Sequence, residues 1–173
     1  MKKQVIDISY NSKEDVSGLQ LEKRLSNLYP YEFYMDGVKM SSWEGFIQSL
    51  KTDDIRTKQI LWQQHGYWAW KNGQKLPWWE KQEVYWLLDP IDRHSDKYTE
   101  LITLSYDYLF LQNMDFREAL KQSLPYKLDH SKGKTNKHET LLTKKEYLFQ
   151  LERLRDQLRP KRKFYNLSNL FKI

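Results

Sequence analysis

Residues 31–51 read YEFYMDGVKMSSWEGFIQSLK, a β-hairpin pattern that runs directly into a helix start. The dipeptide Asp36-Gly37 separates two short segments of strand-forming residues. It is a strong hairpin signal because Gly tolerates the positive φ that a tight type I′ turn demands. Ser41 and Glu44 then have the spacing of a capping box, and apolar residues follow at helical intervals. The stretch predicts a small antiparallel ribbon and then a helix that starts near Ser42.

Apolar side chains at three- and four-residue spacing predict further helices along the chain. The clearest of these patterns follows Ser95, a good capping residue, and a capping box of Thr143 and Glu146 opens the last one. Residues 125–140 form a long polar connection, and long ordered loops often carry function. We expect a strand over 5–10, loop or irregular structure over 66–77, a short amphipathic piece over 78–86, and helices over 55–61, 95–110, 115–120 and 143–158.

These elements predict an α+β fold that is predominantly helical, a single domain with a small N-terminal antiparallel β element. A length of 173 residues fits one domain, and the sequence contains no internal repeat. We expect residues 1–158 to form the domain and residues 159–173 to form a basic C-terminal tail.

Positive charge is concentrated at the C-terminal end. Residues 153–173 contain seven Lys or Arg and one Asp, whereas residues 1–152 carry 22 charges of each sign. One interpretation is a patch that binds phosphate groups, including nucleic acid. The other is a solvated helix end whose cations complement the helix dipole.

Composition excludes several classes of site. The chain has no Cys, so disulfides, zinc-thiolate sites, iron-sulfur clusters and thiol nucleophiles are ruled out. Gly133-Lys134-Thr135 ends like a P-loop but lacks the earlier glycine, and His138-Glu139 lacks the second histidine of a zinc-protease helix. We therefore predict neither a metal nor a cofactor. No run of about 18 apolar residues occurs, so we expect a cytoplasmic protein without a membrane partner.

One helical face combines opposite charges. Glu44, Gln48 and Lys51 lie at four- and three-residue intervals, so their side chains project together. A carboxylate and an amine placed in this way could hold a sugar and its phosphate. The alternative is that Glu44 only closes the capping box and that Lys51 is solvated.

Several segments together resemble the NADAR domain family, also described as YbiA-like, whose pattern runs roughly F-S-N-F, D-G, S-E-H-Y-F-Q-A-Q-K. The spacing matches that pattern without a gap from Asp36 to Lys51. The later segments look like a branch of the family found in phages and bacteria. The matching segments are Leu25-Ser26-Asn27-Leu28, Met35-Asp36-Gly37, 42–51, 91–95, 130–134 and 140–143.

This resemblance implies hydrolysis of the N-glycosidic bond of a riboside. One substrate direction is ADP-ribose attached to guanine in nucleic acid, and the other is a ribosylamino-pyrimidine phosphate of riboflavin synthesis. Glu44 matches the glutamate of the family motif and Lys51 its closing lysine. Two departures stand out: Trp43-Glu44-Gly45-Phe46 replaces S-E-H-Y, and the late D-x-x-W-G segment is missing. The second departure counts against the pyrimidine-phosphate substrate.

On this basis Glu44 and His130 are the expected catalytic residues. Glu44 would stabilise the oxocarbenium-like transition state or orient water, and His130 would protonate the leaving base. Backbone amides around Gly133 would form an anion nest. The expected substrate-binding residues are Ser26 and Asn27 for ribose or phosphate, Trp43 and Trp86 for stacking on a base, Lys51, Arg93 and Lys134 for phosphate, and Ser131 and Gly133 from the branch motif.

Plainer readings stand beside these assignments. The two tryptophans would pack in the core, Asn27 would support a turn before Pro30, and the 130–134 loop would be solvated. Two further functions also remain open: a non-catalytic module that binds ADP-ribose or another nucleotide, and a nucleic-acid-binding protein that uses its basic tail.

Overall fold

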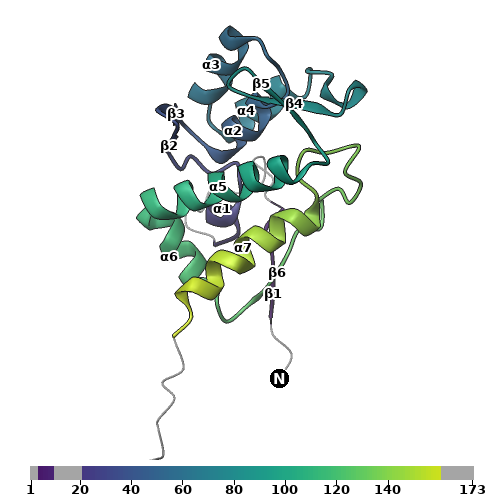
Figure 1. Ribbon diagram of the computed structural model, residues 1–173. Helices are drawn as coiled ribbons and strands as arrows, with labels where there is room; N and C mark the ends of the chain where they lie inside the picture. The colour runs from purple at the N-terminus through teal and green to yellow at the C-terminus, as the bar shows by residue number, and fades with distance from the viewer. Residues whose placement is uncertain (1–3, 10–20, 161–173) are drawn as a thin grey trace, which may run out of the picture.

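Helices are the predominant secondary structure of the computed structural model, which describes residues 4–9 and 21–160 (Figure 1). Helix α5 runs between a group formed by α2, α3 and α4 and a pair formed by α6 and α7 (Figure 1). The helices are α1 Leu21–Leu25, α2 Trp43–Ser49, α3 Ile55–Gln63, α4 Gly66–Gly73, α5 Asp96–Gln112, α6 Met114–Gln122 and α7 Lys144–Leu158, with a short 3-10 helix at Trp78–Glu80. The predicted α+β, predominantly helical single domain is confirmed.

The predicted hairpin is present. Strand β2, Phe33–Met35, pairs antiparallel with β3, Val38–Met40. Asp36 and Gly37 have φ angles of 49° and 79°, as a type I′ turn requires.

Helix α2 begins where the sequence predicts, but its cap differs. The Ser42 hydroxyl accepts the Gly45 amide at 3.1 Å, so Ser42 is the cap and Ser41 is not. Glu44 is consequently not needed to close a capping box, and the plainer reading of that residue is wrong.

Two other helix starts confirm local prediction and one corrects it. Ser95 caps α5, and Thr143 forms with Glu146 the capping box of α7. Helix α6, expected over 115–120, is capped by Asn113 and begins one residue earlier, at Met114.

Two parts of the fold differ from the prediction. Residues 66–73 form a helix. Its N-cap residue, His65, makes no side-chain capping hydrogen bond, so the sequence carries no capping signal for its start. Strands β4, Glu83–Trp86, and β5, Asp89–Asp92, form a second hairpin where a short amphipathic piece was expected. Its turn places Leu87 at φ 53°, which is not a residue that typically marks such a turn.

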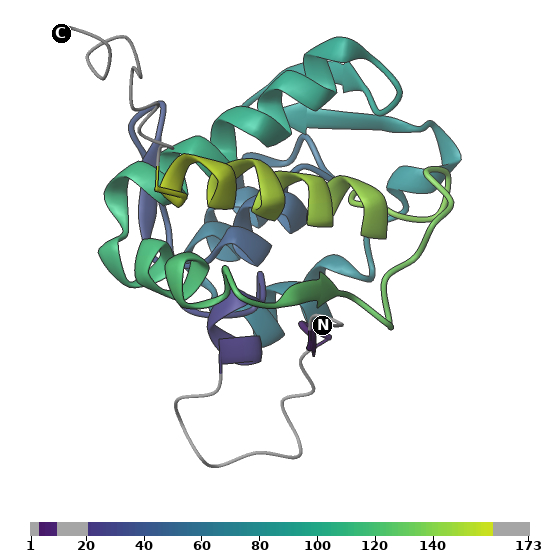
Figure 2. The same cartoon turned by 90° about the horizontal axis from the view of Figure 1, so that it is seen from below.

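The N-terminal strand pairs in parallel with a strand from the later part of the chain. Strand β1, Val5–Asp7, lies beside β6, Lys127–Asp129, in both cartoon views (Figures 1 and 2). Ile6 and Ile8 are buried and anchor β1. The pairing delivers the N-terminal segment to the loop that follows β6.

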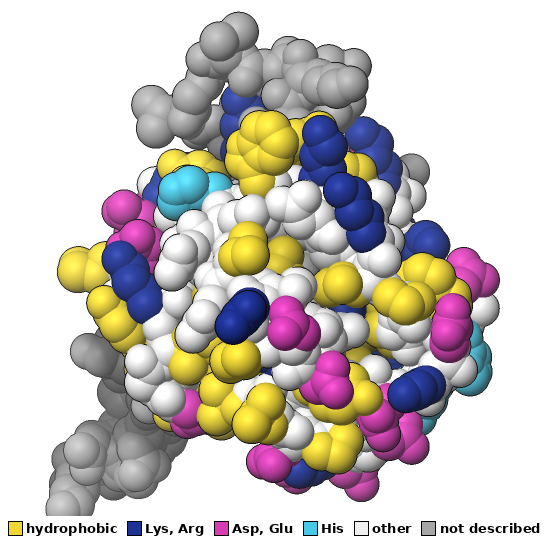
Figure 3. All heavy atoms as spheres, turned by 90° about the horizontal axis from the view of Figure 1, so that it is seen from above, with side chains coloured by type: hydrophobic (Ala, Val, Ile, Leu, Met, Phe, Trp, Pro, Cys, Tyr) yellow, Lys and Arg dark blue, Asp and Glu magenta, His cyan; other side chains and the backbone are white. Residues whose placement is uncertain are grey.

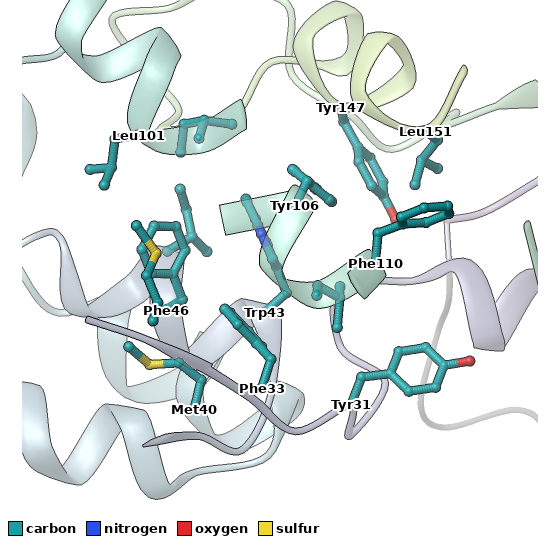
Figure 4. Packing of buried hydrophobic residues seen from close by; sticks show 14 of the residues in the cluster. Tyr31, Phe33, Met40, Trp43, Phe46, Leu101, Tyr106, Phe110, Tyr147 and Leu151 are labelled. Carbon is teal, nitrogen blue, oxygen red and sulfur yellow. The ribbon is translucent and has the colours of Figure 1, made fainter. Parts of the chain in front are cut away.

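Aromatic side chains fill the centre of the core (Figure 4). Trp43 stacks on Tyr106 with ring centroids 4.4 Å apart, and Phe46 lies against Trp43 and Trp86. This packing fixes α2, the helix that carries Glu44, against α5.

In the view from above, several basic side chains lie together in the upper right part of the face, and most acidic ones lie in its lower part (Figure 3). There, hydrophobic side chains are interspersed with basic and acidic ones (Figure 3). The basic tail is outside the described residues except for Arg159, which pairs with Asp156 at 3.0 Å. The domain boundary at residue 158 therefore stays a prediction.

Within residues 4–9 and 21–160, no helix is long and apolar enough to cross a membrane.

Candidate functional site

A cavity of about 620 Å³ lies between α2, α4, the 3-10 helix, the loop after β6 and the start of α7. Its size is typical of small-molecule sites. Seven of the expected site residues border it: Asn27, Trp43, Glu44, Lys51, His130, Gly133 and Lys134.

Glu44 is a buried carboxylate in the wall of this cavity, with only 8% of its surface exposed. The Gln48 side-chain amide donates to Glu44 Oε1 at 2.7 Å. Burial raises the pKa of the Glu44 carboxyl, whereas the Gln48 hydrogen bond and the positive charge of Lys51 act in the opposite direction. The carboxyl therefore takes up a proton more readily than an exposed glutamate does, which suits a group that accepts a proton from water.

Lys51 lies one turn further along the same face. Its ammonium donates to the Gly73 carbonyl at 3.2 Å. Burial lowers the pKa of Lys51 to about 8, partly offset by Glu44, so the amine is still largely protonated at pH 7. Because Lys51 borders the cavity, is only partly exposed and donates to the Gly73 carbonyl, the reading of a solvated Lys51 is wrong.

The end of α4 supports both groups. A Cβ atom on Gly73 would lie 2.1 Å from Gln48 Oε1, so only glycine lets the helix approach this closely. Gly73 thus places the Gln48 amide against Glu44 and offers its carbonyl to Lys51.

His130 borders the cavity opposite α2, directly after β6. Its ring stands edge-on to Tyr147 with centroids 5.3 Å apart, and Nδ1 lies 2.9 Å from Ser9 Oγ. Burial lowers the pKa of the His130 imidazole, so the ring is neutral at pH 7. A neutral ring can donate a hydrogen bond, but it is not the ready proton source expected from the sequence.

The anion nest expected around Gly133 is not formed. The backbone amides of Ser131, Lys132 and Gly133 donate to Asp7 Oδ1, Ser9 Oγ and the His130 carbonyl, respectively. Positive charge at this cavity therefore comes from lysine side chains and not from a backbone nest.

Asn27 remains suited to ligand binding. Its Oδ1 accepts the Tyr106 hydroxyl at 2.9 Å, and its carbonyl accepts the Glu44 amide at 3.1 Å. Neither bond uses the Nδ2 donors, so the side chain can offer them to the cavity.

Trp43 borders the cavity but belongs mainly to the core. Only 1% of its surface is exposed, and its indole N–H donates to Ser105 Oγ at 3.0 Å. Trp70 and Trp79 also border the cavity and are 40% and 49% exposed. They, and not Trp43, can stack on a ligand ring.

Four expected binding residues lie outside the cavity. Ser26 is buried and its hydroxyl accepts the Leu28 amide, which stabilises a turn. Ser131 faces Asp7 and Ser9. Trp86 is a core residue whose indole N–H donates to Asp36 at 2.8 Å.

Arg93 is the clearest of these corrections. It is 1% exposed and makes a bidentate pair with Glu146 at 2.8 and 3.2 Å. Its Nε donates to the Thr140 carbonyl, and its guanidinium lies over the Tyr98 ring. Arg93 therefore joins the loop at Thr140 to Glu146 on α7. Its guanidinium is occupied by these contacts and is not available to bind phosphate.

The sequence interpretation missed some residues that border the cavity. Trp70 and Gln74 lie on α4, which was expected to be irregular, and Trp79 lies in the 3-10 helix. Lys132 adds a third cation beside Lys51 and Lys134. Among the residues that the structure describes, no group of three or more acidic or histidine side chains could hold a metal ion.

The arrangement brings together a buried carboxylate, a neutral imidazole, three lysines, an amide donor and two exposed indoles. Such a set can bind an anionic ligand that carries an aromatic ring. It can also act on a bond held between the carboxylate and the imidazole.

Comparison with known proteins supports this picture of the fold. The model of the bacteriophage protein GP30.3 family matches residues 20–156. A 17.1 kDa protein from the Gp30–rIII intergenic region of Enterobacteria phage T4 is 34% identical over 137 residues, covering 78% of this chain and 90% of that protein. The NMR structure of the E. coli protein YbiA superposes with a TM-score of 0.56 at 16% identity, covering 100% of this chain and 91% of YbiA. This chain therefore belongs to the bacteriophage protein GP30.3 family, a NADAR-like family, and has the YbiA fold.

Proposed function

We infer that the chain is an N-glycosidase that hydrolyses the ribose C–N bond of an ADP-ribosylated guanine in nucleic acid. One observation carries this proposal: Glu44 and His130, from distant parts of the sequence, border one cavity together with Lys51, Lys132 and Lys134. Cleavage of an N-glycosidic bond needs a carboxylate near the anomeric carbon and a donor near the leaving nitrogen.

Glu44 has the properties that the anomeric carbon requires. As the C–N bond breaks, positive charge develops on the ribose. A mostly buried carboxylate such as Glu44 stabilises that charge strongly. Gln48 occupies Oε1 of Glu44, which leaves Oε2 to orient a water molecule. The water adds to the anomeric carbon, and its proton passes to the carboxylate.

His130 serves the leaving group. Because its ring is neutral, His130 donates a hydrogen bond to the departing nitrogen instead of a full proton. The nitrogen takes its proton from the solvent or from the protonated Glu44. The products are a ribose hydroxyl and a base that carries N–H, so atoms and charge balance.

The remaining cavity wall matches the rest of an ADP-ribose group. Lys51, Lys132 and Lys134 supply positive charge for the pyrophosphate, and the free amide of Asn27 suits a ribose hydroxyl. Trp70 and Trp79 offer exposed ring faces for adenine or guanine.

The experiment incubates the full chain with an ADP-ribosylated guanine oligonucleotide, with ribosylamino-pyrimidine phosphate and with simple ribosides, followed by mass spectrometry. We expect release of ADP-ribose from the oligonucleotide and loss of that release in Glu44→Gln. Glu118→Gln, an exposed carboxylate on α6, is the matched control and should retain the activity.

Other products would revise the proposal. Release only from the pyrimidine phosphate would move the substrate to small molecules. Binding of ADP-ribose by calorimetry, without any product after prolonged incubation, would leave a non-catalytic binding module.

A further inference from the structure

The N-terminal segment brings a residue from outside the stretch that matches the family next to His130, which borders the cavity. Strand β1 pairs in parallel with β6, with Asp7 opposite Asp129, and the Ile8 amide donates to the Asp129 carbonyl at 2.9 Å. This register places Ser9 beside His130, the first residue after β6. The family match begins at residue 20.

The contacts around the Ser9 hydroxyl favour one direction for its own proton. A hydroxyl offers one proton and two lone pairs. The Lys132 backbone amide, which can only donate, points at Ser9 Oγ from 2.9 Å, and the Ser131 hydroxyl donates to it at 3.3 Å. Both lone pairs are then in use, so the Ser9 proton is left for His130 Nδ1 at 2.9 Å.

The position of Ser9 is itself fixed. Its backbone amide donates to Asp7 Oδ1 at 3.0 Å, and the same oxygen accepts the Ser131 amide at 3.1 Å. Burial works against the charged form, but these hydrogen bonds hold the pKa of Asp7 well below its ordinary value. Asp7 therefore stays ionised and keeps Ser9 next to the His130 loop.

If Nδ1 accepts the hydrogen bond from Ser9, the proton of the neutral ring must lie on Nε2. A neutral imidazole carries one proton, so Nδ1 as acceptor leaves Nε2 as the N–H donor. Nε2 of His130 has no hydrogen-bond partner within residues 4–9 and 21–160, and the residue borders the cavity.

We propose that Ser9 is a positioning residue that holds His130 as the Nε2–H tautomer, so that its N–H donor is available to the leaving base. This role rests on the proposed glycosidase function. Without Ser9, the neutral ring would populate both tautomers, and only one of them presents a donor at Nε2.

The direct test is the tautomer of His130 in the 15N-labelled full chain. Long-range proton–nitrogen spectra at pH 8 report which nitrogen carries the proton, and the missing signals in His130→Gln assign the ring. We expect the Nε2–H form in the wild-type chain and in Ser9→Thr, which keeps the hydroxyl. Ser9→Ala should shift the ring to a mixture. A wild-type ring in the Nδ1–H form, or a Ser9→Ala ring that does not change, would overturn the proposal.

Kinetics separates this proposal from the proposed function. Loss of one orienting hydrogen bond should lower kcat about tenfold in Ser9→Ala without changing KM, and Ser9→Thr should restore it. If the wild-type chain turns over substrate and Ser9→Ala has the same kcat, the positioning role is refuted and the proposed function stands. If the wild-type chain releases no base from any riboside, the function fails, and the tautomer spectra alone decide whether Ser9 orients the ring.

Discussion

Replacing Glu146 by Gln should destabilise the chain by about 3 kcal/mol, although the new side chain has the same shape. Arg93 is 1% exposed, and its bidentate partner Glu146 has a side chain that is 24% exposed. Removing one partner of a buried pair costs about 3–5 kcal/mol because a buried charge is left uncompensated. Because Glu146 is partly exposed, we expect a cost at the lower end of this range, about 3 kcal/mol. Gln can still close the capping box with Thr143, so the change isolates the charge.

This loss should appear as a lower melting temperature by circular dichroism at pH 7. About 3 kcal/mol corresponds to roughly 6–12 °C for a domain of this size. The matched control is Glu32→Gln, which breaks an exposed pair with Lys39 at 2.9 Å and should cost less than about 1 kcal/mol.

The same pair makes a pH prediction. Burial raises the pKa of Glu146, but the hydrogen bonds from Arg93 and Thr143 lower it more, so folding lowers it overall. Around pH 4 the folded state therefore binds fewer protons than the unfolded state, and the contribution of Glu146 is lost as the pH falls. The difference between wild type and Glu146→Gln should shrink from pH 7 to pH 3. This reasoning would be refuted if Glu146→Gln had the same melting temperature as Glu32→Gln at pH 7. It would also be refuted if the stability difference between wild type and Glu146→Gln grew as the pH falls.

Three further changes test the cavity wall. Gly73→Ala would place a Cβ 2.1 Å from Gln48 Oε1 and displace the amide from Glu44, so kcat should fall about tenfold; an unchanged kcat would contradict this. Because the pKa of Lys51 is about 8, ADP-ribose affinity by calorimetry should weaken from pH 7 to pH 9.5 as the ammonium loses its proton, and Lys51→Met should flatten that dependence. Trp79→Ala should weaken ADP-ribose binding about tenfold through lost stacking, whereas Trp68→Ala, outside the cavity, should not; equal losses would count against a stacking role.

Local signals in the sequence predicted the elements that depend on neighbouring residues. Asp36-Gly37 fixes its hairpin through backbone angles, and Ser95 and Thr143 cap their own helices. These features need no partner from elsewhere in the chain, so their spacing alone is informative.

Two of the elements that were missed depend on distant partners. Strand β6 pairs with β1 across more than a hundred residues, and no turn signal announces such a pair. Helix α4 begins without a side-chain cap and is stabilised by packing on α2, where Gly73 meets Gln48.

The same distinction explains the site. Glu44 and Lys51 share a helical face, so their spacing predicted that they act together. Arg93 was misjudged because the sequence does not reveal that Glu146 neutralises it. Trp70 and Trp79 were overlooked because the segments that carry them were expected to be irregular or amphipathic.

The rate of base release by Glu44→Gln tests the glycosidase proposal most directly. Single-turnover kinetics on an ADP-ribosylated guanine oligonucleotide, together with calorimetry of ADP-ribose, separates chemistry from binding. We predict a rate at least about a hundredfold below wild type, because the variant cannot accept the proton or stabilise the cation, with an affinity within a few-fold of wild type. A Glu44→Gln chain that releases ADP-ribose at the wild-type rate would contradict the role of this carboxylate.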